Sequence, residues 1–299
     1  MTTILFFDDW QLHRRKNMTR HIGKPRLEPH GIFEDPYSDS GWGYPSVSVN
    51  SETGLWKCHY QGQIASGRFV PLLAESDDGV EWRFPDLAEQ VNLPNRLLPH
   101  QVFDMSKSHE WSSVFRDPNA EGTDEWYRGL LADKVDGSGV HANLVASPDG
   151  INWRHIDGVD YHPFGMDPAA HAFWNSHRQS YVITMRPRFG DRRIAISETK
   201  DWRNFSIPEL ALWPDALDTS CAQIYGMPVF RYEDIYVGLT WLYHTTPSIT
   251  EGEKGFMGKI DCQLSYSLNG WHFQRTIREP FIGNEDADGY GAGCVYPSS

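Results

Sequence analysis

The sequence predicts an all-β protein, a five-bladed β-propeller with four clear blades and a partial fifth. Three observations lead to this prediction. One phrase, in which a strand end is followed by a polar turn and an aromatic residue, occurs four times. A hairpin of alternating, aromatic-rich strands precedes each copy. The composition, with 13% aromatic residues and 26 Gly, favours strands and turns over helices.

The repeated phrase supplies the blade period. Its copies are AESDDGVEW, VASPDGINW, AISETKDW and SYSLNGWHF, which end at Trp82, Trp153, Trp202 and Phe273. The Ser residues at positions 76, 147, 197 and 267 are spaced 71, 50 and 70 residues apart, about one blade each. Asp-Gly and Asn-Gly favour positive φ, so we expect hairpin turns at Gly79, Gly150 and Gly270.

The propeller is predicted to occupy residues 31–299, after an N-terminal segment of residues 1–30. From Glu279 the stretch PFIGNEDADGYGAGCVY begins a fifth unit, but only one inner strand of it follows. The N-terminal segment could complete this blade and close the ring, or further residues of a longer protein could do so. A β-sandwich is the alternative fold, because Asp-Gly turns and Trp residues occur there too.

The net charge limits the classes of partner that we expect. The formal net charge is −13 and the pI is near 5.4, and no Lys/Arg cluster is expected to neutralise a run of phosphates, so nucleic acid is not predicted. The apolar run from Ile4 to Phe7 is followed by Asp8 and Asp9. It is too short and too acidic for a signal peptide or a membrane anchor, so we predict no membrane partner and a cytoplasmic location. The oligomeric state is left open.

The four cysteines give no sign of a metal site or a disulfide framework. Cys58, Cys221, Cys262 and Cys294 lie far apart in the sequence and show no CxxC spacing. We therefore expect reduced thiols, mostly buried. No cofactor and no metal ligand is predicted.

Three stretches resemble a known superfamily. They are VFRDPN at 114–119, FGMDPAAHAFWN at 164–175 and SYVITMRPRFGDRRIAISETKDWRNF at 180–205. Over about residues 30–299 the pattern is similar to the five-bladed propeller glycosidases, which include invertases, fructosidases, arabinanases and xylosidases. The resemblance implies a sugar site in the central cavity, three carboxylates from different blades, and hydrolysis of a glycosidic bond. Two motifs differ: the opening Asp motif is matched only by residues 33–37, FEDPY, and no Glu-Cys pair occurs.

Glycoside hydrolysis needs one carboxylic acid to protonate the leaving oxygen and a second carboxylate to attack or to activate water. In a propeller these groups should lie where the inner strands begin, near the axis. Asp167, just before the inner strand at 171–174, is the first candidate, and a Pro-flanked turn is its alternative role. Asp117 belongs to an Arg-Asp-Pro triplet similar to the fructosidase motif, although the repeat phase places Glu110 nearer the cavity. The remaining candidates, from an acidic stretch that could also be a solvated loop, are Asp286 and Asp288.

The same criterion, a position near the start of an inner strand, points to the substrate-binding candidates. Trp42 and Tyr44 could stack on a sugar ring, although core packing is an alternative. Arg186 could orient Asp167 or bind a carboxylate, or it could form a surface ion pair. The other candidates for contacts with a small oligosaccharide or glycoside are His109, His171, Gln223 and Tyr225.

These observations predict a glycoside hydrolase-like enzyme. The alternative is a non-catalytic carbohydrate-binding propeller, either lectin-like or an inactive relative. An enzyme needs two carboxylates within about 5–10 Å across the cavity, whereas a lectin would show equivalent shallow sites between blades. A WD-repeat scaffold is disfavoured because the Trp-Asp and Gly-His signature is absent at the blade period.

Overall fold

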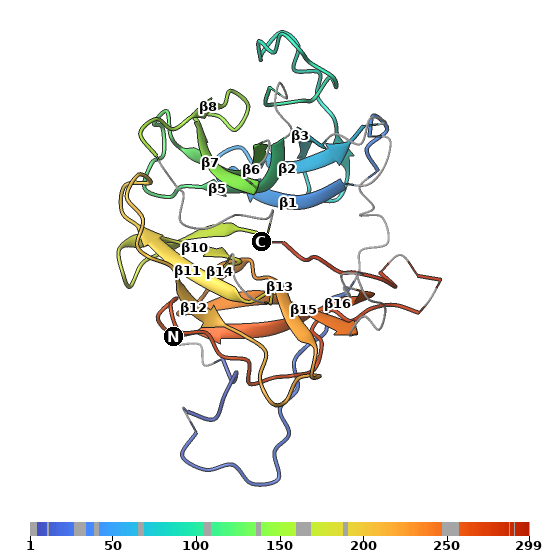
Figure 1. Cartoon of the computed structure of the whole chain (residues 1–299), viewed down its shortest axis with the longest axis vertical. Coiled ribbons are helices and arrows are strands. Elements are labelled where there is room, and N and C mark those ends of the chain that lie inside the picture. The colour runs from blue at the N-terminus through green and yellow to red at the C-terminus, as the bar shows by residue number, and fades with distance from the viewer. Residues whose placement is uncertain are drawn as a thin grey trace.

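The chain folds into four antiparallel sheets of four strands each (Figure 1). The computed structural model describes residues 5–10, 12–26, 34–38, 42–64, 69–104, 109–135, 139–159, 169–187, 191–246, 257–286, 288–289 and 291–298. These described residues contain no helix, and hence none long and apolar enough to cross a membrane. The all-β prediction is confirmed.

Each sheet is one blade of a propeller. Blade 1 contains β1 (Trp42–Val49), β2 (Trp56–Gln63), β3 (Phe69–Ser76) and β4 (Trp82–Arg83). Blade 2 contains β5 (His109–Arg116), β6 (Tyr127–Val135), β7 (Gly139–Ser147) and β8 (Arg154–His155). Blade 3 contains β9 (His171–Asn175), β10 (Ser180–Met185), β11 (Ile194–Thr199) and β12 (Glu209–Leu212). Blade 4 contains β13 (Ala222–Gly226), β14 (Val229–Tyr232), β15 (Ile235–Thr246) and β16 (Met257–Ser267).

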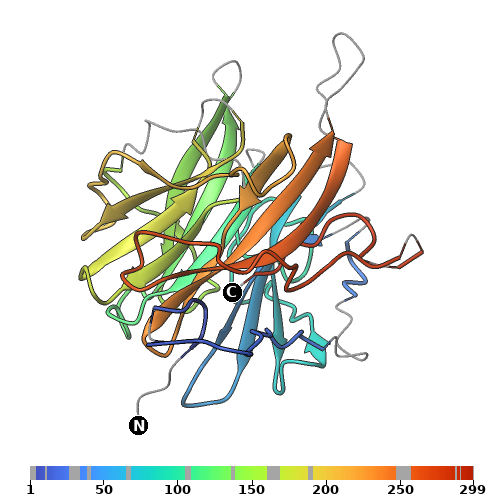
Figure 2. The ribbon, with the colours of Figure 1, turned by 90° about the horizontal axis from the view of Figure 1, so that it is seen from below.

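The blades surround one axis, with the first strand of each blade innermost. In blades 1 to 3 the strands pair in chain order, and β1 contacts β5, β5 contacts β9, and β9 contacts β14 (Figure 2). In blade 4 the inner strand is divided at Pro228, which has no N–H to donate, and both halves, β13 and β14, pair with β15. This arrangement is a propeller and excludes the sandwich.

The repeated phrase forms a turn that side chains hold in shape. The Ser76 hydroxyl accepts a hydrogen bond from the Gly79 N–H at 2.8 Å, and the Asp78 carboxylate accepts one from the Val80 N–H at 2.8 Å. Ser147 with Asp149 and Ser267 with Asn269 repeat the arrangement. The turn is longer than the two-residue hairpin that Asp-Gly predicts. Positive φ is confirmed at the three expected glycines, with 79° at Gly79, 76° at Gly150 and 66° at Gly270.

The third copy of the turn departs from the sequence alignment. Thr199, and not Ser197, caps it by accepting a hydrogen bond from the Trp202 N–H at 3.0 Å, while Ser197 bonds to the Ser206 carbonyl. Trp202 therefore stands where the other copies have glycine, and its φ is +57°. A bulky residue is strained in this region. The compensation is complete burial of the indole, with Tyr181 at 5.2 Å and the Arg128 guanidinium at 5.1 Å.

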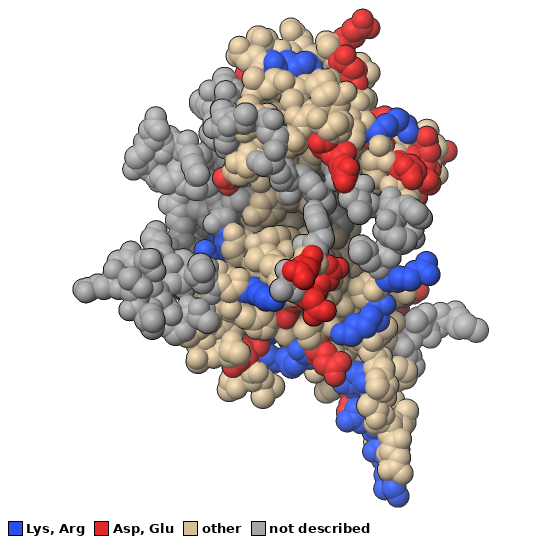
Figure 3. All heavy atoms as spheres, turned by 90° about the vertical axis from the view of Figure 1, so that its right-hand side faces the viewer, with Lys and Arg blue, Asp and Glu red and all other residues tan. Residues whose placement is uncertain are grey.

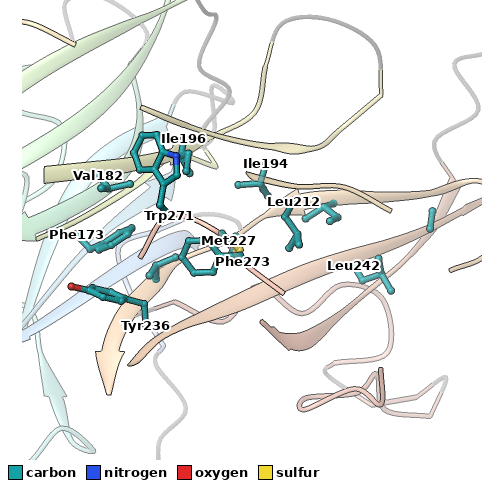
Figure 4. Packing of buried hydrophobic residues seen from close by; sticks show 13 residues of the cluster. Phe173, Val182, Ile194, Ile196, Leu212, Met227, Tyr236, Leu242, Trp271 and Phe273 are labelled. Atoms are coloured by element: carbon teal, nitrogen blue, oxygen red, sulfur yellow. The ribbon is translucent and has the colours of Figure 1, made fainter. Parts of the chain in front are cut away.

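The turns of blades 2 and 4 also fasten their own blade to the preceding one. Lys57 and His59 of blade 1 donate hydrogen bonds to the carbonyls of Asp149 and Gly150 in blade 2, both at 2.7 Å. Asn175 of blade 3 donates to the Asn269 carbonyl of blade 4 at 2.8 Å. Figure 4 shows the apolar core beside this last contact, formed by side chains of blades 3 and 4, with the phenyl ring of Phe173 5.5 Å from that of Tyr236.

The expectation of a fifth blade is corrected, because the described residues form four sheets. The segment after Glu279 follows the outer edge of β16 instead of starting a new sheet: the Cys262 N–H donates to the Ile282 carbonyl at 2.9 Å, and the Val295 N–H donates to the Ile260 carbonyl at 3.0 Å. The unpaired edge of β16 attracts this segment because it offers free backbone groups. Leu5, Phe7 and Ile22 of the N-terminal segment cover one face of β15 and β16. Whether residues 1–30 close the ring stays a prediction.

Part of the N-terminal segment projects from the body and is basic. It carries six Lys and Arg residues and no acidic residue between residues 12 and 26, and blue side chains run along this projection in Figure 3. Trp10 lies at its base and is 84% exposed. The net charge of −13 for the whole chain gave no indication of this local excess of positive charge. The absence of a nucleic-acid partner stays a prediction.

Two of the four cysteines are buried. Cys58 and Cys262 lie in blade cores, Cys221 is half-buried and Cys294 is exposed, and all four are free thiols. Burial raises the pKa of the Cys58 thiol to about 12, so it remains protonated at neutral pH. All four thiols are free, as the sequence predicted. The sequence also predicted that most of them are buried, whereas only two of the four are.

The position of Trp202 makes a stability prediction. Trp202→Ala should lower the free energy of unfolding by about 3–5 kcal/mol, because a buried indole is lost. Trp202→Gly should cost about 1 kcal/mol less than Trp202→Ala, since glycine adopts positive φ without strain. Urea unfolding checks the order of the two variants, with the exposed Trp10→Ala as a neutral control. An alanine variant more stable than the glycine variant would show that Trp202 is unstrained.

Candidate functional site

Five side chains from three blades meet where the inner strands begin. We call Tyr44, His171, Arg186, Tyr225 and Trp241 the axial cluster. The indole of Trp241 lies 6.3 Å from the ring of Tyr44, 5.5 Å from His171 and 6.4 Å from Tyr225, between ring centroids. The guanidinium of Arg186 lies over the ring of Tyr225 at 4.5 Å. Four of these residues were predicted as substrate-binding, and the structure brings them together.

Local backbone features place the aromatic rings at the axis. Tyr44 has a φ of +51° beside a register shift between β1 and β2, which turns its side chain away from the regular strand direction. Gly226 ends β13 directly against the ring of Trp241, where any Cβ would clash with the indole. The register of β13 against β15 also shifts between Ile224 and Gly226. Both irregularities open room for the axial cluster.

The axial cluster contains neutral hydroxyl and imidazole groups. Burial, and next the neighbouring Tyr225, raise the pKa of Tyr44 far above its usual value, so the phenol stays protonated. Burial lowers the pKa of His171 to about 3, so its ring is neutral at physiological pH. His171 Nε2 is buried and has no hydrogen-bond partner among the described residues. A buried polar atom of this kind can serve a ligand.

A second arginine borders the axial cluster. The Arg192 guanidinium lies 5.2 Å from the ring centroid of Tyr225 and 5.7 Å from that of Tyr243. Its Nη1 donates a hydrogen bond to Gln223 Oε1 at 2.9 Å. Gln223, another predicted substrate-binding residue, is therefore beside the axial cluster and already holds Arg192 in place. Cation–π contacts with Tyr225 orient both arginines.

The C-terminal residues close one side of this site. The ring of Tyr296 lies 5.2 Å from Trp241 and 5.6 Å from Tyr225, and Trp241 Nε1 donates to the Pro297 carbonyl at 2.9 Å. The end of the chain accordingly lies near the middle of the molecule in Figures 1 and 2. The sequence assigned no role to Trp241, Arg192 or Tyr296.

The first catalytic candidate, Asp167, lies outside the described residues. The chain is described again from Ala169, which is buried and packs in one core cluster with Trp241. Glu110 is half-buried in β5, opposite Ala132 of β6, near the start of the inner strand as the repeat phase predicted. The backbones of Trp42 and His109 begin β1 and β5, but their side chains lie outside the described part of the chain.

Asp117 lies at the opposite end of β5, in a buried ion-pair network that links blade 2 to blade 3. Its carboxylate is fully buried and accepts a hydrogen bond from Arg128 Nε at 3.0 Å. Arg128 also pairs with Glu125 at 2.6 Å, and Glu125 pairs with Arg203 of blade 3 at 2.8 Å. Burial opposes ionisation of Glu125, but the Arg203 and Arg128 hydrogen bonds lower its pKa to about 2. This geometry gives Asp117 a stabilising role remote from the axial cluster.

Asp286 and Asp288 lie in an exposed loop. Asn284 anchors this loop by donating to the Ile260 carbonyl at 2.8 Å, and Glu285 closes it by accepting from the Gly291 N–H at 3.1 Å. The solvated-loop alternative describes these residues well. Their catalytic assignment stays a prediction that no contact of the described residues favours.

A buried Asp–Tyr–His group at the edge of blade 1 was not anticipated. Asp35 Oδ2 accepts a hydrogen bond from the Tyr60 hydroxyl at 2.8 Å and lies 3.2 Å from His100 Nε2. All three side chains are almost completely buried. Burial opposes ionisation of Asp35, but the hydrogen bonds from His100 and the Tyr37 N–H outweigh it and lower the pKa. The Glu-Asp-Pro stretch pointed to Asp35, whereas no sequence pattern linked it to His100.

Comparison with known proteins supports the fold and leaves the activity open. No protein-family model matches the chain, and no curated protein matches it. An N-acetylgalactosamine deacetylase from F. plautii, solved with blood group B trisaccharide, is similar, with a TM-score of 0.63 at 14% identity over 92% of this chain and 79% of that one. A thermostable family-43 glycoside hydrolase has a TM-score of 0.59 at 12% identity over 89% and 83%.

A further similar structure is the endo-arabinase from Bacteroides thetaiotaomicron VPI-5482, with a TM-score of 0.56 at 12% identity over 85% of each chain. At identities this low the likeness establishes the fold alone. The chain therefore shares its propeller fold with glycoside hydrolases, and the predicted superfamily resemblance is confirmed at that level. Activity has to be inferred from the site.

The ion pair of Asp117 makes a prediction that separates its two possible roles. Asp117→Asn should lower the free energy of unfolding by about 3–5 kcal/mol, because Arg128 loses a buried counter-charge. Turnover per folded molecule should remain unchanged. Chemical unfolding and kinetics on the same preparation check this, with the exposed Asp157→Asn as control. A loss of kcat with unchanged stability would instead make Asp117 catalytic.

Buried histidines predict a loss of stability in mild acid. Burial lowers the pKa of His59 to about 4 and that of His171 to about 3, although the Gly150 carbonyl partly opposes the shift at His59. The unfolded chain takes up these protons near pH 6.5 and the native state does not, so stability is present above pH 6.5 and is lost as pH falls toward 4. Each histidine contributes a slope of up to about 1.4 kcal/mol per pH unit.

Unfolding titrations between pH 7 and pH 5 measure this slope. His244 acts in the opposite sense, because the hydrogen bond to Asp261 raises its pKa and adds stability as it becomes protonated. His59→Gln keeps a donor for the Gly150 carbonyl and should make the pH dependence shallower. An identical slope in this variant would contradict the assignment to His59.

Proposed function

We propose that this chain is a glycoside hydrolase-like enzyme that binds a small oligosaccharide or glycoside at the axial cluster. One observation carries the proposal: aromatic rings, a neutral imidazole and a guanidinium from three blades meet at the propeller axis. The half-buried rings of Tyr44 and Tyr225 suit the apolar C–H surface of a sugar ring, and the buried indole of Trp241 packs against both. His171 Nε2 suits one of its hydroxyl groups.

In this proposal Asp167 supplies a carboxylate to the reaction. It lies two residues before Ala169, which packs in one core cluster with Trp241. One carboxylic acid protonates the leaving oxygen as the glycosidic bond breaks, and a second carboxylate attacks the sugar or takes a proton from water. Glu110, near the start of β5, is the partner that the described residues favour.

A carbohydrate-binding propeller without catalysis is the second candidate. The absence of two superfamily motifs from the sequence favours it. The similar deacetylase bears another activity on a comparable fold, so glycan binding is a more general expectation than hydrolysis. Binding without turnover on natural oligosaccharides would support this candidate.

The role of Asp167 gives the decisive test. Aryl glycosides and natural oligosaccharides are first screened for turnover by the wild type. On the best substrate, Asp167→Asn should lower kcat by roughly two to four orders of magnitude and change KM little, because charge is lost and shape is kept. The melting temperature should stay close to that of the wild type.

Asp117→Asn serves as the matched control, since it removes a carboxylate remote from the axial cluster. Full activity of Asp167→Asn, or a loss confined to its melting temperature, would make Asp167 a structural turn residue. The catalytic role would then pass to Glu110 or to the acidic loop.

A further inference from the structure

A groove lies between blades 3 and 4, beside the axial cluster. It has a volume of about 440 Å³, within the range of small-molecule sites. One wall is the connection from β12 to β13, residues 213–222, and the other contains Asp191 and Arg193. Arg192, between these two residues, stacks on Tyr225 of the axial cluster. The groove therefore opens at the same end of the propeller as the proposed active site.

Two arginines fix the wall that carries Trp213. The Arg275 guanidinium is buried, donates to Asp218 Oδ1 at 3.0 Å, and reaches the Trp213 carbonyl at 3.4 Å. Arg278 holds Asp215 in the same way, with Nη1 donating to Oδ1 at 3.1 Å. Asp218 also accepts a hydrogen bond from the Asp215 N–H at 2.8 Å. The loop is thus fixed before any ligand arrives, which reduces the entropy cost of binding.

The fixed loop presents its aromatic side chain to solvent. Trp213 lines the groove and is 51% exposed, although its own backbone is anchored. An indole that only served the core would be buried, as Trp202 and Trp241 are. The structure instead holds a large apolar face at the groove. Such a face stacks on the C–H surface of a sugar.

Polar groups of both hydrogen-bonding senses surround this indole. Arg193 and Asp191 form an ion pair on one wall, while Thr219 and Ser220 supply hydroxyl groups on the other. Sugar hydroxyls both donate and accept, so they need this mixture.

We propose that this groove binds a second sugar unit of the substrate, with Trp213 as its stacking platform. The site rests on the proposed function and extends it: the substrate is an oligosaccharide that reaches from the axial cluster into the groove. A glycoside with a single sugar would occupy the axial cluster alone. Substrate length is therefore the variable that reveals the groove.

The test compares three variants on substrates of increasing length. Trp213→Ala removes the platform, Trp213→Phe keeps an aromatic face, and Trp10→Ala removes an exposed indole far along the chain. Kinetics are measured on aryl monosaccharide glycosides and on arabino-, xylo- and manno-oligosaccharides from disaccharide to hexasaccharide. We expect Trp213→Ala to lower kcat/KM about tenfold on the longer substrates and to leave the aryl glycoside unaffected. Trp213→Phe should recover most of the loss, and Trp10→Ala should match the wild type.

The outcomes separate this site from the proposed function. Unchanged kinetics of Trp213→Ala at every length, or an equal loss at every length, would overturn the groove and leave the axial site standing. A wild type that neither binds nor cleaves any of these carbohydrates would overturn both. A change in sedimentation of Trp213→Ala without any change in kinetics would identify a protein contact instead, since the neighbouring Ile207 and Leu217 are also exposed.

Discussion

The packing around the indole of Trp241 holds the centre of the molecule together. The indole touches Tyr44 of blade 1, His171 of blade 3 and Tyr296 of the C-terminal residues, and its Nε1 bonds to the Pro297 carbonyl. The contact with Tyr44 joins blade 4 to blade 1 at the axis. This packing requires glycine at position 226, because the Cβ of any larger residue would displace the indole.

The capped turns connect neighbouring blades at the periphery of the molecule. Each turn from blade 2 to blade 4 meets the blade before it, through a backbone carbonyl or through a buried aromatic ring. Trp82 of blade 1 has no preceding blade and is only partly buried, whereas Trp202 is fully buried. Irregular segments pack against the side chains of β15 and β16: Leu5 and Phe7 from the N-terminal segment, and Phe281 and Ile282 from the C-terminal one.

Local patterns predicted most of the fold and part of the site. Ser-x-Asp-Gly turns and alternating strands depend on neighbouring residues, so the four blades and the glycines of the turns could be found from the sequence. The inner-strand phase also placed Tyr44 and Tyr225 at the axis. The contacts of Trp241, the His100 partner of Asp35, and the use of Thr199 in place of Ser197 depend on packing between distant segments or on exact turn geometry. The prediction of a fifth blade was wrong because the strand-like sequence after Glu279 pairs with the free edge of β16.

The two ends of the inner strands have different chemistry, and this difference bears on where catalysis can occur. At the end where β5 finishes, Asp117, Arg128 and Glu125 neutralise one another in a buried network, so their hydrogen-bonding capacity is used for stability. At the other end, His171 keeps a buried nitrogen without a partner among the described residues, and Arg192 lies over the ring of Tyr225. Polar groups that the fold does not need for its own stability are those that a substrate can use. His171 Nε2 is such an atom, and it favours the proposed site at the end that bears the axial cluster and the groove.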